Sequence, residues 1–119
     1  MPFVDPRQLP EKMPGEGWHG RFFHSEHMTF AYYDIDAGAA VHQHFHENEE
    51  VWHVLDGEME ITIGRETELV GAGRAAIVPA DIPHSARAVT TCRVIVVDQP
   101  TRATLAGISL VDRRSGSEP

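Results

Sequence analysis

Three histidines occur at every second position in one short segment, and a glutamate follows them. His42, His44 and His46 lie between Gly38 and Glu50. In a β-strand, side chains two residues apart point to the same face, so the three imidazoles would share one face. Imidazole nitrogens and a carboxylate oxygen are common ligands of divalent transition metals. The spacing therefore predicts a metal site.

Two other interpretations of this segment exist. A helix would also place His42, His46 and Glu50 on one face, because these residues are four apart. A solvated loop rich in histidine is the second, and three alternate histidines followed by a glutamate disfavour it. Strand patterns flank the segment on both sides, and Gly38 and Gly57 bracket it. We therefore expect strands here.

The chain from Trp18 onward consists of short β-branched, aromatic and apolar runs separated by glycine and proline. Asp56-Gly57 predicts a short hairpin between two of these runs, because both residues tolerate positive φ. Many short strands without a convincing long helix predict an all-β barrel or sandwich. The strands are expected at residues 28–35, 51–55, 59–63, 67–70, 74–78, 84–89 and 93–98.

The two ends of the chain differ in composition from this strand-rich part. Residues 1–17 contain four prolines and two glycines, which predicts an extended N-terminal arm. Residues 109–119 are polar and predict a C-terminal tail. A barrel domain over residues 18–108 would lie between them.

Length and composition disfavour several classes of function. The chain has 119 residues, which suits one domain, and a formal charge of -8, which disfavours nucleic acid and anionic membranes as partners. No apolar run approaches the ~20 residues of a membrane helix, and no signal peptide is visible at the N-terminus. Cys92 is the single cysteine, which fits a reducing compartment. We expect a cytoplasmic protein with a small-molecule substrate.

The histidine segment resembles the first motif of the cupin family. That motif has a glycine, five residues, His-x-His, three residues, a glutamate, six residues and a glycine. The matching residues are Gly38, His44, His46, Glu50 and Gly57.

The second cupin motif follows after fifteen residues and carries the resemblance to about Ala88. Gly73, Pro79 and His84 match it. Asp81 stands where the family prefers glycine, and aspartate is one of the few other residues that tolerate a left-handed backbone. Ala88 stands where the family has asparagine. Neither departure removes a metal ligand.

The resemblance implies a single cupin barrel, a double-stranded β-helix or jelly roll, with an extended N-terminal arm, and most relatives are homodimers. The implied metal ligands are His44, His46, Glu50 and His84. They would hold one divalent transition metal per chain (Fe, Mn, Ni, Zn or Cu) and leave two octahedral positions open.

Four further residues are candidate catalytic groups. His42 is expected on the inward face as a hydrogen-bond donor or general base, and Tyr33 as a proton carrier. Asp98 and Arg102 resemble an Asp and Arg pair in small cupins that open unsaturated uronate rings, although here the aromatic residue between them is missing. Those cupins also have glutamine where Glu50 stands. An exposed ion pair after a strand is the alternative for this pair.

The leading functional hypothesis is a metal-dependent enzyme that isomerises, or opens the ring of, a small sugar or carboxylate. One alternative is a dioxygenase that uses Fe(II) or Mn(II). Another is a non-catalytic cupin that binds or senses a ligand. The acidic charge and the lack of an attached DNA-binding segment disfavour a one-chain regulator.

Overall fold

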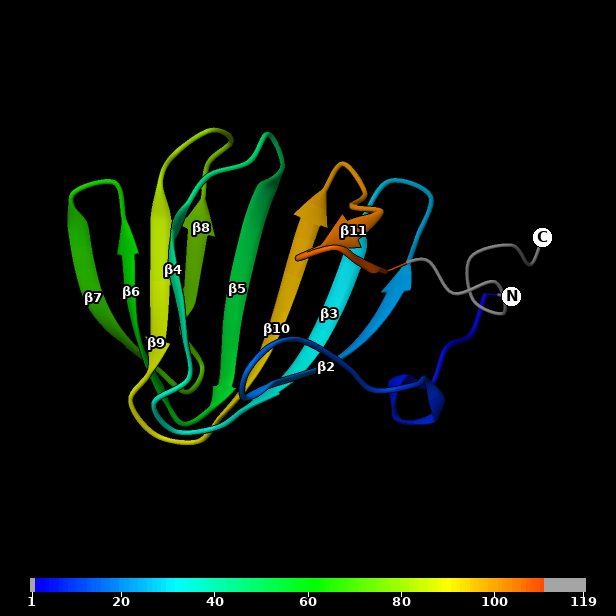
Figure 1. Ribbon diagram of the computed structural model, residues 1–119, viewed down its shortest axis with the longest axis horizontal. Coiled ribbons are helices and arrows are strands. Elements are labelled where there is room, and N and C mark those ends of the chain that lie inside the picture. The colour runs from blue at the N-terminus through cyan, green and yellow to red at the C-terminus, as the bar shows by residue number, and fades with distance from the viewer. Residues whose placement is uncertain (1, 111–119) are drawn as a thin grey trace.

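The computed structural model describes residues 2–110 as two antiparallel β-sheets that pack against each other. Figure 1 shows the strands ordered along the long axis, from β7 at one end to β2 at the other. The larger sheet has the order β1 (Lys12–Gly15), β2 (Trp18–His24), β3 (Thr29–Ile35), β10 (Cys92–Gln99), β5 (Glu49–Asp56) and β8 (Ala75–Val78). The smaller sheet has the order β4 (Ala40–His44), β9 (His84–Ala88), β6 (Glu58–Ile63) and β7 (Glu66–Gly71).

These sheets form the all-β jelly roll of a cupin, as the sequence predicts. Among the described residues there is no α-helix, and the only helical turn is the 3-10 helix η1 (Pro6–Gln8). The segment that contains His42 and His44 is strand β4, so the helical alternative is wrong. No helix among residues 2–110 is long and apolar enough to cross a membrane.

The hairpin expected at Asp56-Gly57 is wrong. The strands on either side of it, β5 and β6, belong to different sheets, so this turn carries the chain from one sheet to the other. Gly57 does adopt the positive φ that the turn pattern predicts, at 83°. A turn pattern specifies local backbone angles, whereas the partner of each strand is decided by long-range pairing. The tight hairpin lies one connection later, where Ile63 pairs with Glu66.

Alternating burial along the strands builds the core between the sheets. In β2 and β3 every second residue is buried, as expected for strands with one covered face. The ring of Trp18 packs edge-on against Tyr33 at 5.4 Å and against Trp52 at 5.9 Å between centroids. Aromatic side chains from three strands of the larger sheet therefore meet in the core beside the histidine segment.

Both ends of the chain contribute to the sheets or to the core. Within residues 1–17, strand β1 pairs with β2, with Gly15 opposite Trp18. Near the C-terminus, β11 (Thr104–Leu105) and β12 (Ile108–Ser109) form a small hairpin, and Leu110 after it is 2 % exposed. Residues 111–119 of the expected tail lie outside the described residues. The boundaries of the arm, barrel and tail stay a prediction.

Replacing Gly57 with alanine should destabilise the protein by well over about 1 kcal/mol, because two penalties combine. The residue has positive φ, and a Cβ atom there would lie 2.2 Å from the carbonyl oxygen of Thr91. Gly73→Ala is the matched control, since Gly73 has a φ of 86° but no atom of the described chain within 4 Å of the added Cβ. Urea unfolding of both variants measures the difference. Equal free energies of unfolding for the two variants would contradict the close approach at Gly57.

Candidate metal centre

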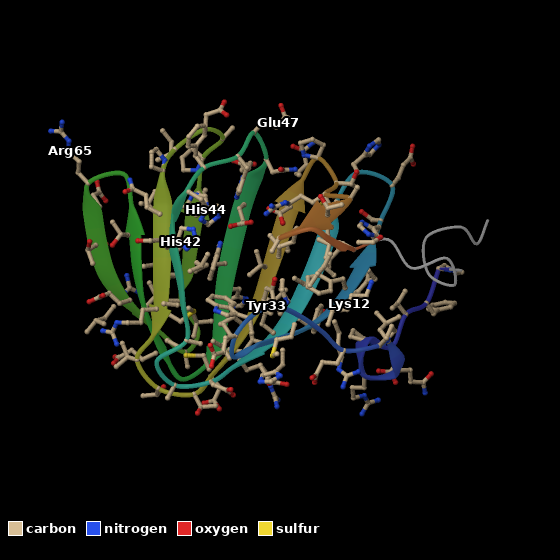
Figure 2. All side chains as sticks on the ribbon, viewed as in Figure 1. Lys12, Tyr33, His42, His44, Glu47 and Arg65 are labelled. Atoms are coloured by element: carbon tan, nitrogen blue, oxygen red, sulfur yellow. The ribbon has the colours of Figure 1, made fainter. Side chains whose placement is uncertain are left out.

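A β-bulge in β4 decides which histidines face inward. Val41 pairs with Ala86 and His44 pairs with His84, so three residues of β4 advance against two of β9. The extra residue inverts the strand's alternation, which puts both Val41 and His44 on the inner side. His42 is exposed, and the inward orientation expected for it is wrong. Figure 2 shows His42 and His44 on β4, with Tyr33 lower in the view.

Three histidines and one glutamate meet at one end of the space between the sheets. The candidate ligand nitrogens of the three imidazoles lie within 4.8 Å of one another. Glu50 Oε2 is 3.5 Å from His46 Nε2, and Glu50 Oε1 is 3.6 Å from His84 Nε2. The contributing segments are β4 for His44, the following loop for His46, β5 for Glu50 and the first residue of β9 for His84.

Backbone hydrogen bonds fix the tautomer of each imidazole. The Nδ1–H of every ring donates to a carbonyl oxygen two residues away in the chain, so each Nε2 carries a lone pair. The acceptors for His44, His46 and His84 are the carbonyls of His42, Asn48 and Ile82, at 2.9, 3.0 and 2.8 Å. The Nε2 atoms of His46 and His84 are buried and have no hydrogen-bond partner among residues 2–110. Converging, unpartnered lone pairs of this kind fit a metal ion.

Glu50 supplies a negative charge to the same cluster. Burial raises the pKa of its carboxyl, but the contacts with His46, Asp98 and Trp52 outweigh this and lower the pKa overall. The indole Nε1–H of Trp52 donates to Glu50 Oε1 at 2.6 Å. Glu50 is therefore a carboxylate at neutral pH. Three imidazoles and one carboxylate are compatible with one metal ion, and this mixed donor set suits several transition metals.

The two cupin motifs are joined through Asp81. Its backbone N–H donates to the carbonyl of His46 at 2.8 Å, which ties the loop before β9 to the loop after β4. Asp81 has a φ of 64°, so the left-handed backbone expected at this departure from the family pattern is confirmed. The bond holds the segment that carries His46 close to the start of β9, where His84 lies.

Asp98 and Arg102 lie beside the cluster and are not an exposed ion pair. Asp98 is opposite Glu50 in the pairing of β10 with β5 and is 5 % exposed. The Arg102 side chain is 17 % exposed, with its guanidinium 3.6 Å from Glu50 Oε2 and 4.0 Å from Asp98 Oδ2. Burial and the neighbouring Glu50 raise the pKa of Asp98, so Asp98 holds the proton of this carboxyl pair. Their catalytic roles stay a prediction.

Tyr33 is buried farther inside, among aromatic rings. Its ring makes edge contacts with Trp18 at 5.4 Å and Phe22 at 5.7 Å. Burial, and then the negative charges of Glu50 and Asp98, raise the pKa of the Tyr33 phenol. Its hydroxyl can therefore donate a hydrogen bond but does not act as a base near neutral pH.

A cavity of about 130 Å³ extends from the cluster into the space between the sheets. His44, Glu50, Asp98 and Arg102 line its polar end. Sequence reasoning did not place the apolar residues of this wall, several of which lie near the chain ends. The missed residues include Pro14, Trp18, Phe22, Leu105 and Leu110. The apolar residues Leu105, Ile108 and Leu110, which precede the polar end of the chain, were the available signal.

This fold and this cluster define a cupin with a candidate metal site. A cupin domain model matches residues 31–98, more than half of the chain, and the chain belongs to this family.

Individual relatives extend the match beyond the two motifs. The chain is 33% identical over 91 residues to the uncharacterized protein SCO3923 of Streptomyces coelicolor, covering 76% of this chain and 87% of that protein. The crystal structure of TT1209 from Thermus thermophilus is 31% identical, with a TM-score of 0.71, and the match covers 86% of this chain and all of TT1209 (100%). The structure of KdgF from Halomonas sp. has a TM-score of 0.78 at 22% identity, covering 84% and 94% of the two chains, and shows the shared fold.

The metal content of the protein should depend on His84. His84→Ala removes one imidazole ligand and should lower bound metal at least tenfold, whereas His53→Ala removes an exposed histidine of β5 and should leave it unchanged. Elemental analysis of protein purified without a nickel column or chelator measures this. Circular dichroism of both variants checks that they are folded. Equal metal content in folded His84→Ala and His53→Ala would refute the site.

Proposed function

We propose that the protein is a metal-dependent enzyme that isomerises, or opens the ring of, a small substrate bearing a carboxylate. The observation that supports this most is the position of Asp98 and Arg102. Both line the polar end of the cavity together with His44 and Glu50. A cation, a proton carrier and a metal-ligand cluster within one cavity form a set suited to enolate-type chemistry.

His44, His46, His84 and Glu50 would hold the metal. A divalent metal bound there would act as a Lewis acid toward substrate oxygen atoms. The open side of the cluster faces the cavity, since His44 and Glu50 both line it.

Arg102 is the candidate anchor for the substrate carboxylate. Arg102 lines the cavity, and its backbone is held there because the Arg102 N–H donates to Thr29 Oγ1 at 2.8 Å. Its guanidinium lies 3.6 Å from Glu50 Oε2. Guanidinium and carboxylate groups pair through two parallel hydrogen bonds, which fixes the orientation of the anion. A divalent metal and Arg102 would together carry three positive charges against the single negative charge of Glu50. A bound substrate anion would therefore bring the net charge of the site closer to zero.

Asp98 is the candidate proton carrier. Its Oδ1 atom is buried and has no hydrogen-bond partner in the described part of the chain, while Oδ2 lies near Arg102. A carboxyl group in the cavity wall that holds a proton can exchange it with a bound substrate, which isomerisation and ring opening both require. Tyr33 supports this as a hydrogen-bond donor, whereas the exposed His42 does not reach the cavity.

Two substitutions should separate binding from chemistry. Arg102→Gln should raise KM for a carboxylate substrate roughly tenfold to a hundredfold, because a charged hydrogen bond is lost. Asp98→Asn should lower kcat about 10²- to 10⁴-fold with less effect on KM. Arg93→Gln is the control, since Arg93 lies on the same strand, forms an exposed ion pair with Asp34 and is outside the cavity. Steady-state kinetics of the metal-loaded protein measure these effects.

The substrate panel for this test contains unsaturated uronates, keto sugars and keto acids, and oxygen uptake is followed in parallel. Turnover without oxygen uptake supports the proposal. Turnover that consumes oxygen would assign the alternative dioxygenase chemistry instead. Ligand-dependent thermal stabilisation without any turnover would favour a binding or sensing cupin.

A further inference from the structure

We infer that the substrate has an apolar body of about the size of one six-membered ring, joined to the carboxylate, and is not a polyhydroxylated sugar acid. This inference rests on the proposed function and specifies its substrate class. It follows from the distribution of polar atoms in the cavity wall, from the cavity's size and from the fixed position of the wall that the C-terminal segment forms.

The polar side chains of the cavity are confined to one end. Beyond the cluster, the described wall is formed mainly by aromatic and aliphatic side chains from β2, β3, β10 and the C-terminal hairpin. These include Trp18, Phe22, Ala31, Val96, Leu105 and Leu110. A substrate that reaches past Arg102 therefore contacts hydrocarbon.

Apart from the Tyr33 hydroxyl, the polar side-chain atoms in this part of the wall already have hydrogen-bond partners. The Trp18 Nε1–H donates to a backbone carbonyl at 3.3 Å, and the Trp52 Nε1–H donates to Glu50 at 2.6 Å. The hydroxyl oxygen of Thr29 accepts the backbone N–H of Arg102 and lies 2.8 Å from a ring nitrogen of His24.

Tyr33 could serve one substrate oxygen, but a sugar acid carries a hydroxyl on nearly every carbon. Each hydroxyl buried without a partner is penalised by the loss of its hydrogen bonds to water. An aliphatic or aromatic body incurs no such penalty and gains from leaving water.

The cavity volume sets an upper limit on this body. A cavity of about 130 Å³ is slightly smaller than the roughly 150 Å³ apolar cavity that accommodates benzene in another protein. A branched aliphatic group or a single ring therefore fits between the polar end and Leu110. A second ring would not.

The part of the cavity wall that the C-terminal segment forms is held in place by hydrogen bonds. The backbone N–H of Leu110 donates to the carbonyl of Ala103 at 2.8 Å, and the carbonyl of Leu110 accepts from His24 Nε2 at 2.7 Å. Lys12 Nζ donates to the carbonyl of Ser109 at 2.6 Å. These bonds hold Leu105 and Leu110 as a preformed apolar wall, which favours ligands that match it.

Tryptophan fluorescence can test this inference without turnover, because both tryptophans of the chain line the cavity. The probes are 4-methyl-2-oxopentanoate and phenylglyoxylate as apolar acids, pyruvate as a truncated acid and galacturonate as a sugar acid. We expect the two apolar acids to bind at least tenfold more tightly than galacturonate to the zinc-loaded protein. From pyruvate to 4-methyl-2-oxopentanoate, affinity should rise about fourfold per added methylene.

Two variants locate the binding of the apolar body. Ala31→Leu fills the cavity from β3 and should weaken phenylglyoxylate binding at least tenfold while pyruvate binding changes little. Leu105→Ala enlarges the cavity and should let phenylpyruvate, which is one methylene longer, bind as tightly as phenylglyoxylate. Leu69→Ala is the control, because Leu69 is an exposed leucine of β7 outside the cavity. If Ala31→Leu does not fold, the comparison of Leu105→Ala with Leu69→Ala still tests whether the apolar body binds in this cavity.

The outcomes separate this inference from the proposed function. Tighter binding of galacturonate than of the apolar acids, or no binding of any acid, overturns the inference. Turnover of a uronate would overturn it while supporting the proposed enzyme class. Tight binding of the apolar acids without turnover of any substrate would support the inference and contradict the proposed function.

Discussion

The hydrogen bond from each imidazole Nδ1 to a backbone carbonyl is the interaction on which the site depends. In all three histidines the acceptor lies two residues away, so the local backbone sets both the tautomer and the direction of the ring. A free imidazole would point its Nε2 in many directions, and ordering it has an entropic cost of its own. Here the rings are ordered when the chain folds, because the sheets and loops fix the acceptor carbonyls. The three lone pairs therefore converge without a bound ligand.

This dependence explains why two irregular backbone positions lie beside the site. The bulge in β4 is needed because a regular strand would not place both Val41 in the core and His44 in the cluster. The left-handed Asp81 turns the chain so that its N–H reaches the carbonyl of His46. The bulge interrupts the pairing of β4 with β9, and Asp81 lies in the connection between β8 and β9. Both bring a ligand into position. The fold is regular where it builds the core and irregular where it builds the site.

Strand periodicity predicted an all-β barrel or sandwich, because it is a local property of the sequence. The jelly roll and the four clustered residues were implied by the resemblance to the two cupin motifs. Sequence reasoning failed at His42, since alternation assumes a regular strand and the bulge inverts it. It failed at Asp56-Gly57 because positive φ does not specify which strand pairs with which. It could name Asp98 and Arg102 but not place them, because their position follows from the long-range pairing of β10 with β5.

The polar cluster and the apolar part of the cavity wall place different requirements on one ligand. Buried Nε2 atoms without partners in the described chain, and a carboxyl pair that shares one proton, each cost stability, by about 1–3 kcal/mol for an unpaired polar group. A purely structural core would replace them with hydrocarbon, as the aromatic rings around Tyr33 do nearby. Their retention at one end of a hydrocarbon-lined space is the arrangement expected where stability is exchanged for ligand binding. A metal and an anion would satisfy the polar end and an apolar group the remainder, which is why the ligand we propose is amphipathic.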